Sequence, residues 1–104
     1  MIVGYLNDCV KITEPYLSWI NSRMKFAAID IGTNAVRLLI KEVNIAKSGY
    51  EVRKVSFTRV PIRLGEDVFE TGRISNKKAR NLVKVMRAFW YLMDVYEIEW
   101  FKVC

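Results

Sequence analysis

KFAAIDIGTNAVRLLIKEV, residues 25–43, is the stretch of this sequence that decides the fold. Two apolar runs, residues 25–31 and 35–43, flank Gly-Thr-Asn, which predicts a strand, a tight turn and a second strand. Gly32 and Asn34 are residue types that accept a positive φ, so the turn can fold back sharply and direct consecutive N–H groups at one point. A concavity of this kind attracts anions.

Downstream of this hairpin the pattern predicts further elements. Residues 50–63 alternate in part between apolar and polar side chains, which indicates a third antiparallel strand with Pro61 at its end or on a sheet edge. Residues 64–74, rich in glycine and acidic residues, indicate a loop. A helix follows from the N-cap Ser75, with an apolar seam made of Ala79, Leu82, Met86, Phe89, Met93 and Tyr96. The run at residues 98–104 predicts a last strand, so we expect an α/β fold in the order β-β-β-α-β.

The composition restricts the chemistry available to the chain. It has 104 residues with a formal net charge of +6, 52% hydrophobic residues and no histidine. That length leaves room for one small packed domain, and no apolar run approaches the roughly 20 residues that span a bilayer. Two isolated cysteines, Cys9 and Cys104, favour free thiols and a cytoplasmic location over a disulfide. Any chemistry must therefore use carboxylates, backbone amides and a bound ion.

Residues 1–23 differ from the rest of the chain. Their basic and acidic side chains cancel, so the whole positive charge belongs to residues 24–104. The segment lacks the basic start and the long apolar run of a signal peptide. Its periodicity is weak, and residues 16–20 could form one turn of helix with Pro15 at a first-turn position. We expect residues 1–23 to be an extension outside the fold.

Asp30 lies at the end of an apolar strand, just before the predicted anion-binding turn. An acid beside a phosphate-binding loop is typical of a bridging cation, and Mg²⁺ could be held by one carboxylate, phosphate oxygens and a hydroxyl such as that of Thr33. The alternative is that Asp30 only caps the turn by accepting hydrogen bonds from nearby amides. Local physics leaves both interpretations open.

Two arginines near the turn have similar alternatives. Arg37 faces the side of its strand opposite Val36 and Leu38, where it could reach phosphate or only solvate the sheet. Arg63 lies where the third strand gives way to a loop, and from there its guanidinium could contact phosphate or fix loop carboxylates. The residues alone do not decide between these roles.

The predicted helix carries a basic stripe opposite its apolar seam, formed by Lys77, Arg80, Lys84 and Arg87. Such a stripe is usually a solvated surface, so nucleic-acid binding is not the favoured interpretation. The large aromatic residues Trp90, Tyr91 and Trp100 are expected in the core or in a buried interface rather than as base-stacking platforms.

Residues 24–104 closely resemble the start of the exopolyphosphatase and guanosine-pentaphosphate phosphatase (Ppx/GppA) family, a branch of the sugar kinase, heat-shock chaperone and actin (ASKHA) superfamily. Three motifs in the same order carry the resemblance: AAIDIGTNAVRLLI at residues 27–40, RLGEDVFETGRIS at residues 63–75, and the helix leading to FKVC at residues 101–104. The resemblance implies a ribonuclease H-like (actin-like ATPase) half-domain with a mixed sheet, truncated after its last strand.

The family hydrolyses phosphoanhydride or phosphate-ester bonds in inorganic polyphosphate or guanosine pentaphosphate (pppGpp), a stringent-response nucleotide, usually with Mg²⁺. On this resemblance, Asp30 would orient the metal or its waters. The phosphate contacts would come from Gly32, Thr33, Asn34, Arg37 and Arg63. Catalysis would rest on positioning and charge neutralisation, with a carboxylate activating water.

The sequence departs from the family's pattern after Cys104. The Thr-x-x-x-Arg-type segment, the downstream glutamate taken as general base and the second Gly-rich phosphate loop are absent from these 104 residues. We therefore expect no catalytic residue within this chain and no turnover by it alone, which leaves open whether it is an enzyme. An open sheet edge and apolar surface from Phe89, Trp90 and Trp100 predict aggregation, a homo-oligomer or another partner.

Two other functions remain as alternatives. A small basic module could hold polyphosphate or RNA without cleaving it, or the chain could be a nonfunctional gene fragment. The sequence does not choose between polyphosphate and guanosine pentaphosphate, because the residues that would read a nucleoside lie outside it.

Overall fold

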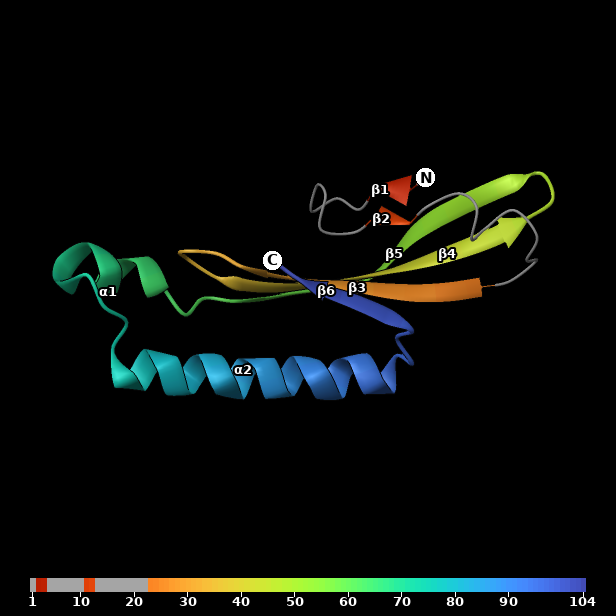
Figure 1. Cartoon of the computed structure of the whole chain (residues 1–104). Coiled ribbons are helices and arrows are strands. Elements are labelled where there is room, and N and C mark those ends of the chain that lie inside the picture. The colour runs from red at the N-terminus through yellow and green to blue at the C-terminus, as the bar shows by residue number, and fades with distance from the viewer. Residues whose placement is uncertain (1, 4–10, 13–22) are drawn as a thin grey trace.

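A computed structural model of the chain describes residues 2–3, 11–12 and 23–104, and Figure 1 shows its arrangement. Four strands form one sheet in the order β5-β4-β3-β6, and their bounds are β3 Arg23–Ile31, β4 Val36–Ala46, β5 Gly49–Val60 and β6 Trp100–Val103. Strand β6 pairs parallel to β3, whereas β3, β4 and β5 are antiparallel neighbours, so the sheet is mixed. The short strands β1 (Ile2–Val3) and β2 (Lys11–Ile12) pair separately. The expected α/β fold and its mixed sheet are confirmed.

The segment expected to be a loop contains a helix. Helix α1 spans Leu64–Thr71, before the predicted helix, α2, at Asn76–Val95. Its acidic residues Glu66 and Asp67 lie in the first turn, where negative charge favours a helix N-terminus, and Gly72 ends the helix with φ 73°. The glycine and the acids that indicated a loop are therefore the end signals of a short helix.

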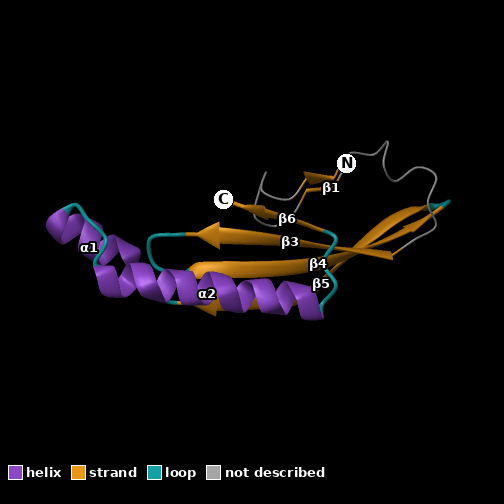
Figure 2. Cartoon of the chain, turned by 60° about the horizontal axis from the view of Figure 1, so that its bottom comes forward, coloured by secondary structure: helices purple, strands orange, loops and turns teal. Residues whose placement is uncertain are grey.

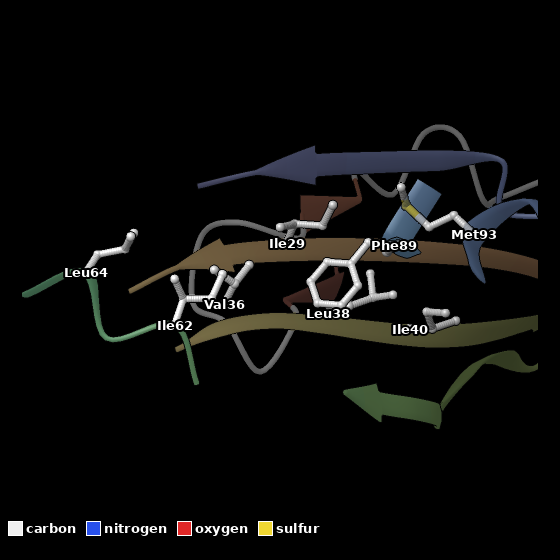
Figure 3. Close-up of a cluster of buried hydrophobic side chains, with 9 residues drawn as sticks. Ile29, Val36, Leu38, Ile40, Ile62, Leu64, Phe89 and Met93 are labelled. Atoms are coloured by element: carbon white, nitrogen blue, oxygen red, sulfur yellow. The ribbon is translucent and has the colours of Figure 1, made fainter. Parts of the chain in front are cut away.

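Helix α2 runs along one face of the sheet (Figure 2) and closes the main core. Ser75 caps it as predicted, because its hydroxyl accepts a hydrogen bond from the Lys78 amide at 3.3 Å. Figure 3 shows Phe89 and Met93 of this helix against apolar side chains of β3 and β4. Phe89 is only 1% exposed. This packing fixes the two strands, and with them the turn that joins them.

The aromatic residues beside that seam are not in the core. Trp90, Tyr91 and Trp100 are 60%, 69% and 63% exposed, which corrects the expectation of core positions, and a buried interface for them stays a prediction. Phe89 is predicted both on the apolar seam of the helix and among the residues of the exposed apolar surface; it is buried, so its place on the seam is confirmed and its exposure is wrong. The reason is helical rotation: one residue changes the direction of a side chain by about 100°, so Phe89 and Trp90 cannot both face the sheet.

Strand pairing defines what lies on the two faces of the sheet, because residues paired across neighbouring strands share a face. Ala27 and Ile40 are partners on the face covered by α2. Asp30 pairs with Arg37, one residue out of phase with Ile29 and Leu38, so this charged pair lies on the opposite face. Pro61 follows directly after the last residue of β5, as expected for a residue that cannot donate to a ladder.

The predictions for the N-terminal segment mostly concern residues that lie outside the part of the chain that the structure describes. The helical turn over residues 16–20 and Cys9 lie there, and the boundary between residues 23 and 24 stays a prediction. Cys104 is disulfide-bonded in the structure, which corrects the expectation of a free thiol at that position. Within the described ranges, no helix is both long enough and apolar enough to cross a membrane.

Candidate functional site

The β3–β4 turn, residues 32–35, is closed by a hydrogen bond from the Gly32 amide to the Ala35 carbonyl oxygen at 3.0 Å. Neither Gly32 nor Asn34 has a positive φ, so the prediction that these residues adopt a left-handed conformation is wrong. The lack of room for a side chain accounts for a glycine at position 32 instead. A Cβ at position 32 would lie 3.1 Å from the Ala35 oxygen and 3.2 Å from Nη2 of Arg37. The glycine at position 32 therefore lets the Ala35 oxygen and the Arg37 guanidinium lie close to the backbone. The amide of Gly32 is not available to a ligand, because it donates to the Ala35 oxygen.

The turn rests on the N-terminus of α1. The Arg63 amide donates to the Asn34 carbonyl oxygen at 2.8 Å, and the Gly65 amide donates to the Thr33 carbonyl oxygen at 2.8 Å. A Cβ at Gly65 would meet Cβ of Thr33 at 3.1 Å. These contacts hold both carbonyl groups of the turn against α1.

The amides of the same two residues have a different environment. Thr33 and Asn34 are both exposed. Within residues 2–3, 11–12 and 23–104, neither amide donates a hydrogen bond to a protein atom. Two neighbouring N–H groups are thus available at the tip of a turn whose carbonyl groups are fixed, which suits an anion.

Asp30 and Arg37 face each other across β3 and β4, beside the turn. Nη2 of Arg37 lies 3.3 Å from Oδ2 of Asp30, and the two side chains are 39% and 28% exposed. Arg37 therefore contacts a carboxylate rather than only solvating the sheet. The carboxylate of Asp30 is bound by this guanidinium and, in the described part of the chain, by none of the turn amides that the capping interpretation required.

Arg37 also carries an unsatisfied donor. Its Nε is buried and has no hydrogen-bond partner among the described residues. A buried donor without a partner costs about 1–3 kcal/mol, so this arginine is held in a place that its own contacts do not fully satisfy. An anion arriving beside Asp30 could engage the guanidinium further.

The oxygen donors beside the turn bear on whether Mg²⁺ could bind there. Among the described residues no three acidic or cysteine side chains gather as a metal cluster. Asp30 offers one partly exposed carboxylate beside the hydroxyl-bearing Thr33, and Mg²⁺ commonly takes one or two carboxylates and completes its shell with water and phosphate oxygens. The residues therefore fit a metal that arrives with its phosphate ligand, because Arg37 contacts one oxygen of the Asp30 carboxylate, Oδ2.

Arg63 is held in a left-handed conformation, φ 59°, at the start of α1. Its Nη1 lies 3.5 Å from Oε1 of Glu66, and its side chain is 65% exposed. The guanidinium thus pairs with a carboxylate of α1, while the backbone amide of Arg63 holds the turn. The described contacts do not bring this side chain together with Asp30 and Arg37.

Lys78 was not singled out from the sequence, and it joins α1 to α2. Its Nζ donates to the Arg63 carbonyl oxygen at 2.7 Å and lies 3.2 Å from Oε2 of Glu66 and 3.0 Å from Oδ1 of Asp67. The other oxygen of Asp67 accepts from the Ser75 amide at 2.8 Å. Lys78 meets Glu66 and Asp67 only because those two acids lie on helix α1. A loop was expected in place of α1, so the spacing of these residues in the sequence did not predict the network.

This network shifts two pKa values. Hydrogen bonds from Ser75, followed by that from Lys78, lower the pKa of Asp67 from 3.8 to about 2. The hydrogen bond to Asp67, assisted by Glu66, raises the pKa of Lys78 above its usual value. Both groups are therefore held in their charged forms, and they tie the N-terminus of α2 to the segment that supports the turn.

No family model matches the chain, but solved structures resemble it. A Ppx/GppA family member from Aquifex aeolicus, solved by crystallography, has 29% sequence identity and a TM-score of 0.70, over 79% of this chain and 26% of that one. An exopolyphosphatase structure from Cytophaga hutchinsonii has a TM-score of 0.67 at 18% identity, over 77% of this chain and 24% of that one, and this likeness concerns the fold alone.

A curated relative extends the comparison in sequence. The bifunctional 3-dehydroquinate synthase/phosphatase of Fusobacterium nucleatum is 31% identical over 94 residues, which is 89% of this chain and 14% of that protein. The chain thus spans about a quarter of the solved structures it matches and a smaller share of the curated relative.

Proposed function

Because the chain has the fold of the N-terminal quarter of Ppx/GppA phosphatases, we propose that it supplies the first phosphate-binding loop of a phosphatase. The bonds cleaved would be phosphoanhydrides of inorganic polyphosphate or of guanosine pentaphosphate. The observation that carries the proposal is the exposed turn at Thr33 and Asn34, whose amides donate to no described protein atom and whose carbonyl groups are fixed by α1.

Each residue of the turn region has a part in this proposal. The amides of Thr33 and Asn34 bind phosphate oxygens, while Gly32 allows the guanidinium of Arg37 to lie close to the turn. Arg37 and Asp30 lie beside the same turn, so the guanidinium neutralises phosphate charge and the carboxylate holds Mg²⁺ or its waters. When bound, Mg²⁺ would neutralise charge that develops on the phosphate during transfer. Arg63 contributes through its backbone and adds a positive charge near the site.

The proposal includes no catalytic residue within this chain. Polyphosphate hydrolysis needs a group that activates water, and the described site offers only Asp30, which is engaged by Arg37 and assigned to the metal. The chain alone is accordingly expected to bind phosphate chains without turning them over. A phosphate-release assay with polyphosphate and Mg²⁺ tests this, and turnover well above that of Asp30→Ala would overturn it.

Calorimetric titration of the full 104-residue chain with tripolyphosphate tests the binding itself. With Mg²⁺ present, Asp30→Ala should weaken binding by about tenfold, in line with the loss of one charge-assisted contact. Asp94→Ala, which removes an acid from α2, is the matched control and should bind as the original chain does. Equal affinity for the original chain and Asp30→Ala would contradict the proposed role of Asp30.

A second candidate is a basic binding module without any link to cleavage. One observation favours it: Lys77, Arg80, Lys84 and Arg87 are all exposed. Replacing these four by glutamine would abolish a salt-sensitive affinity for polyphosphate or RNA in this case, whereas Asp30→Ala would leave it unchanged. A nonfunctional remnant would show neither affinity.

The remaining parts of the proposal concern substrate, assembly and location. Competition between polyphosphate and guanosine pentaphosphate would decide the substrate class. The exposed side chains of Trp90 and Trp100, and the place of β6 at the edge of the described four-stranded sheet, support self-association or docking on a partner, which sedimentation of the full chain would detect. A cytoplasmic location stays a prediction, and cell fractionation tests it.

A further inference from the structure

Arg59 lies in a row of charged residues that crosses three strands. Arg59 of β5 pairs directly with Arg37 of β4, and Arg37 pairs directly with Asp30 of β3. Partners in register share a face of the sheet, so all three side chains lie on the face opposite α2. Arg59 is next to last in β5, so the row lies close to the end of the sheet where the β3–β4 turn is found.

The charges in this row do not balance. Like charges placed directly opposite each other on antiparallel strands are destabilising. Asp30 is a single carboxylate, and it is bound by Arg37 at 3.3 Å. Arg59 is exposed and makes no ion pair with any described residue, and no described residue accepts a hydrogen bond from Nε of Arg37. The row thus holds two guanidinium groups and one carboxylate, and among the described ion pairs that carboxylate binds only Arg37.

We propose that Arg59 and Arg37 together form a second phosphate subsite, which holds a linear phosphate chain as it leaves the turn and crosses β4 toward β5. The inference rests on the proposed function and extends it from the turn to the sheet face. Neighbouring strands lie about 4.8 Å apart, so the row offers guanidinium groups at successive positions along an extended anion. The preferred ligand is therefore a chain of phosphates rather than a single orthophosphate.

The chemistry of arginine suits this role. The guanidinium fork binds two phosphate oxygens at once and remains charged at every pH relevant to a protein. A lysine would supply the charge without the fork. Arg59→Lys is therefore expected to restore only part of what Arg59→Gln removes.

Titration of the full chain with tripolyphosphate and with orthophosphate, in Mg²⁺, tests the subsite. Arg59→Gln should weaken tripolyphosphate binding by about tenfold, as expected for one charge-assisted hydrogen-bonded contact, and should change orthophosphate binding much less. Arg73→Gln removes an exposed arginine that makes no ion pair with a described residue, and it should leave both affinities unchanged.

A second readout needs no ligand. Because the Arg37–Arg59 pair is repulsive, Arg59→Gln should raise the melting temperature of the free chain at low ionic strength, and added salt should reduce the gain. A melting temperature that is unchanged or lower would overturn the unbalanced pair on which the subsite rests.

The outcomes separate this inference from the proposed function. If Arg59→Gln binds tripolyphosphate as the original chain does while Asp30→Ala is weakened, the subsite is wrong and the turn remains the phosphate site. If all variants and the original chain fail to bind tripolyphosphate, the proposed function fails and the subsite falls with it.

Discussion

The Gly65 amide donates a 2.8 Å hydrogen bond to the carbonyl oxygen of Thr33, and this contact joins the first turn of α1 to the turn between β3 and β4. The two residues are far apart in sequence, yet a Cβ at Gly65 would lie 3.1 Å from Cβ of Thr33. The glycine of the RLGE motif is therefore the point at which α1 supports the candidate phosphate loop.

Gly65→Ala should destabilise the chain by about 1–2 kcal/mol, because backbone atoms of the turn must move to admit the methyl group. The gain in helix propensity, about 1 kcal/mol, offsets part of the strain. Urea denaturation measures the difference. In a double-mutant cycle, Thr33→Gly should recover part of the loss, and strictly additive effects of the two changes would contradict the contact.

Asp67 makes stability depend on pH in a narrow acidic range. Its pKa is lowered from 3.8 to about 2 by the hydrogen bonds from Ser75 and Lys78. A carboxyl group whose pKa is depressed on folding stabilises the folded state above its unfolded pKa, and this contribution is lost as the pH falls through the folded pKa. Melting temperatures measured from pH 5 down to about 2 should therefore fall more for the original chain than for Asp67→Asn, and parallel curves would contradict this.

Lys78 should control how firmly the turn is held. Its Nζ donates to the Arg63 carbonyl oxygen at 2.7 Å, and the amide of Arg63 in turn donates to Asn34. Lys78→Met keeps an unbranched side chain one atom shorter and removes the charged donor, so the Arg63 and Gly65 amides should exchange with solvent deuterium faster. Lys77→Met, at the neighbouring exposed position, is the matched control and should leave exchange at both amides unchanged.

Phe89 should dominate the stability of the core. It is 1% exposed and lies among Ile29, Leu38 and Met93 (Figure 3). Phe89→Ala should cost about 3–5 kcal/mol, because it removes a large buried ring and leaves a cavity. Tyr91→Ala, at a side chain that is 69% exposed, should change stability by less than about 0.5 kcal/mol. Similar losses for both variants in urea denaturation would contradict the packing of α2.

Much of the fold could be predicted because its signals are local. The apolar runs before and after Gly-Thr-Asn identify β3 and β4, and the three-and-four spacing after Ser75 identifies α2. Helix α1 was missed because Gly65 and the two acids have the composition of a loop. Their role depends on a contact between Gly65 and Thr33 that no local pattern contains.

The candidate site was predictable in its members and less so in its geometry. Asp30 and Arg37 could be placed beside the turn from strand alternation alone. Their ion pair depends on the register of β3 against β4. In the same way, Arg37 and Arg59 lie opposite each other because of the register of β4 against β5. Register is set by pairing over whole strands, so it could not be read from a few residues of the motif.

The most direct test of the phosphate loop is a titration of the ¹⁵N-labelled chain with tripolyphosphate and Mg²⁺, followed through the backbone amide signals. If the turn binds phosphate, the shifts are saturable, are largest at Thr33 and Asn34, and are reduced in Asp30→Ala. Largest shifts on α2, at Lys77, Arg80, Lys84 and Arg87, with the turn amides unmoved, would contradict it.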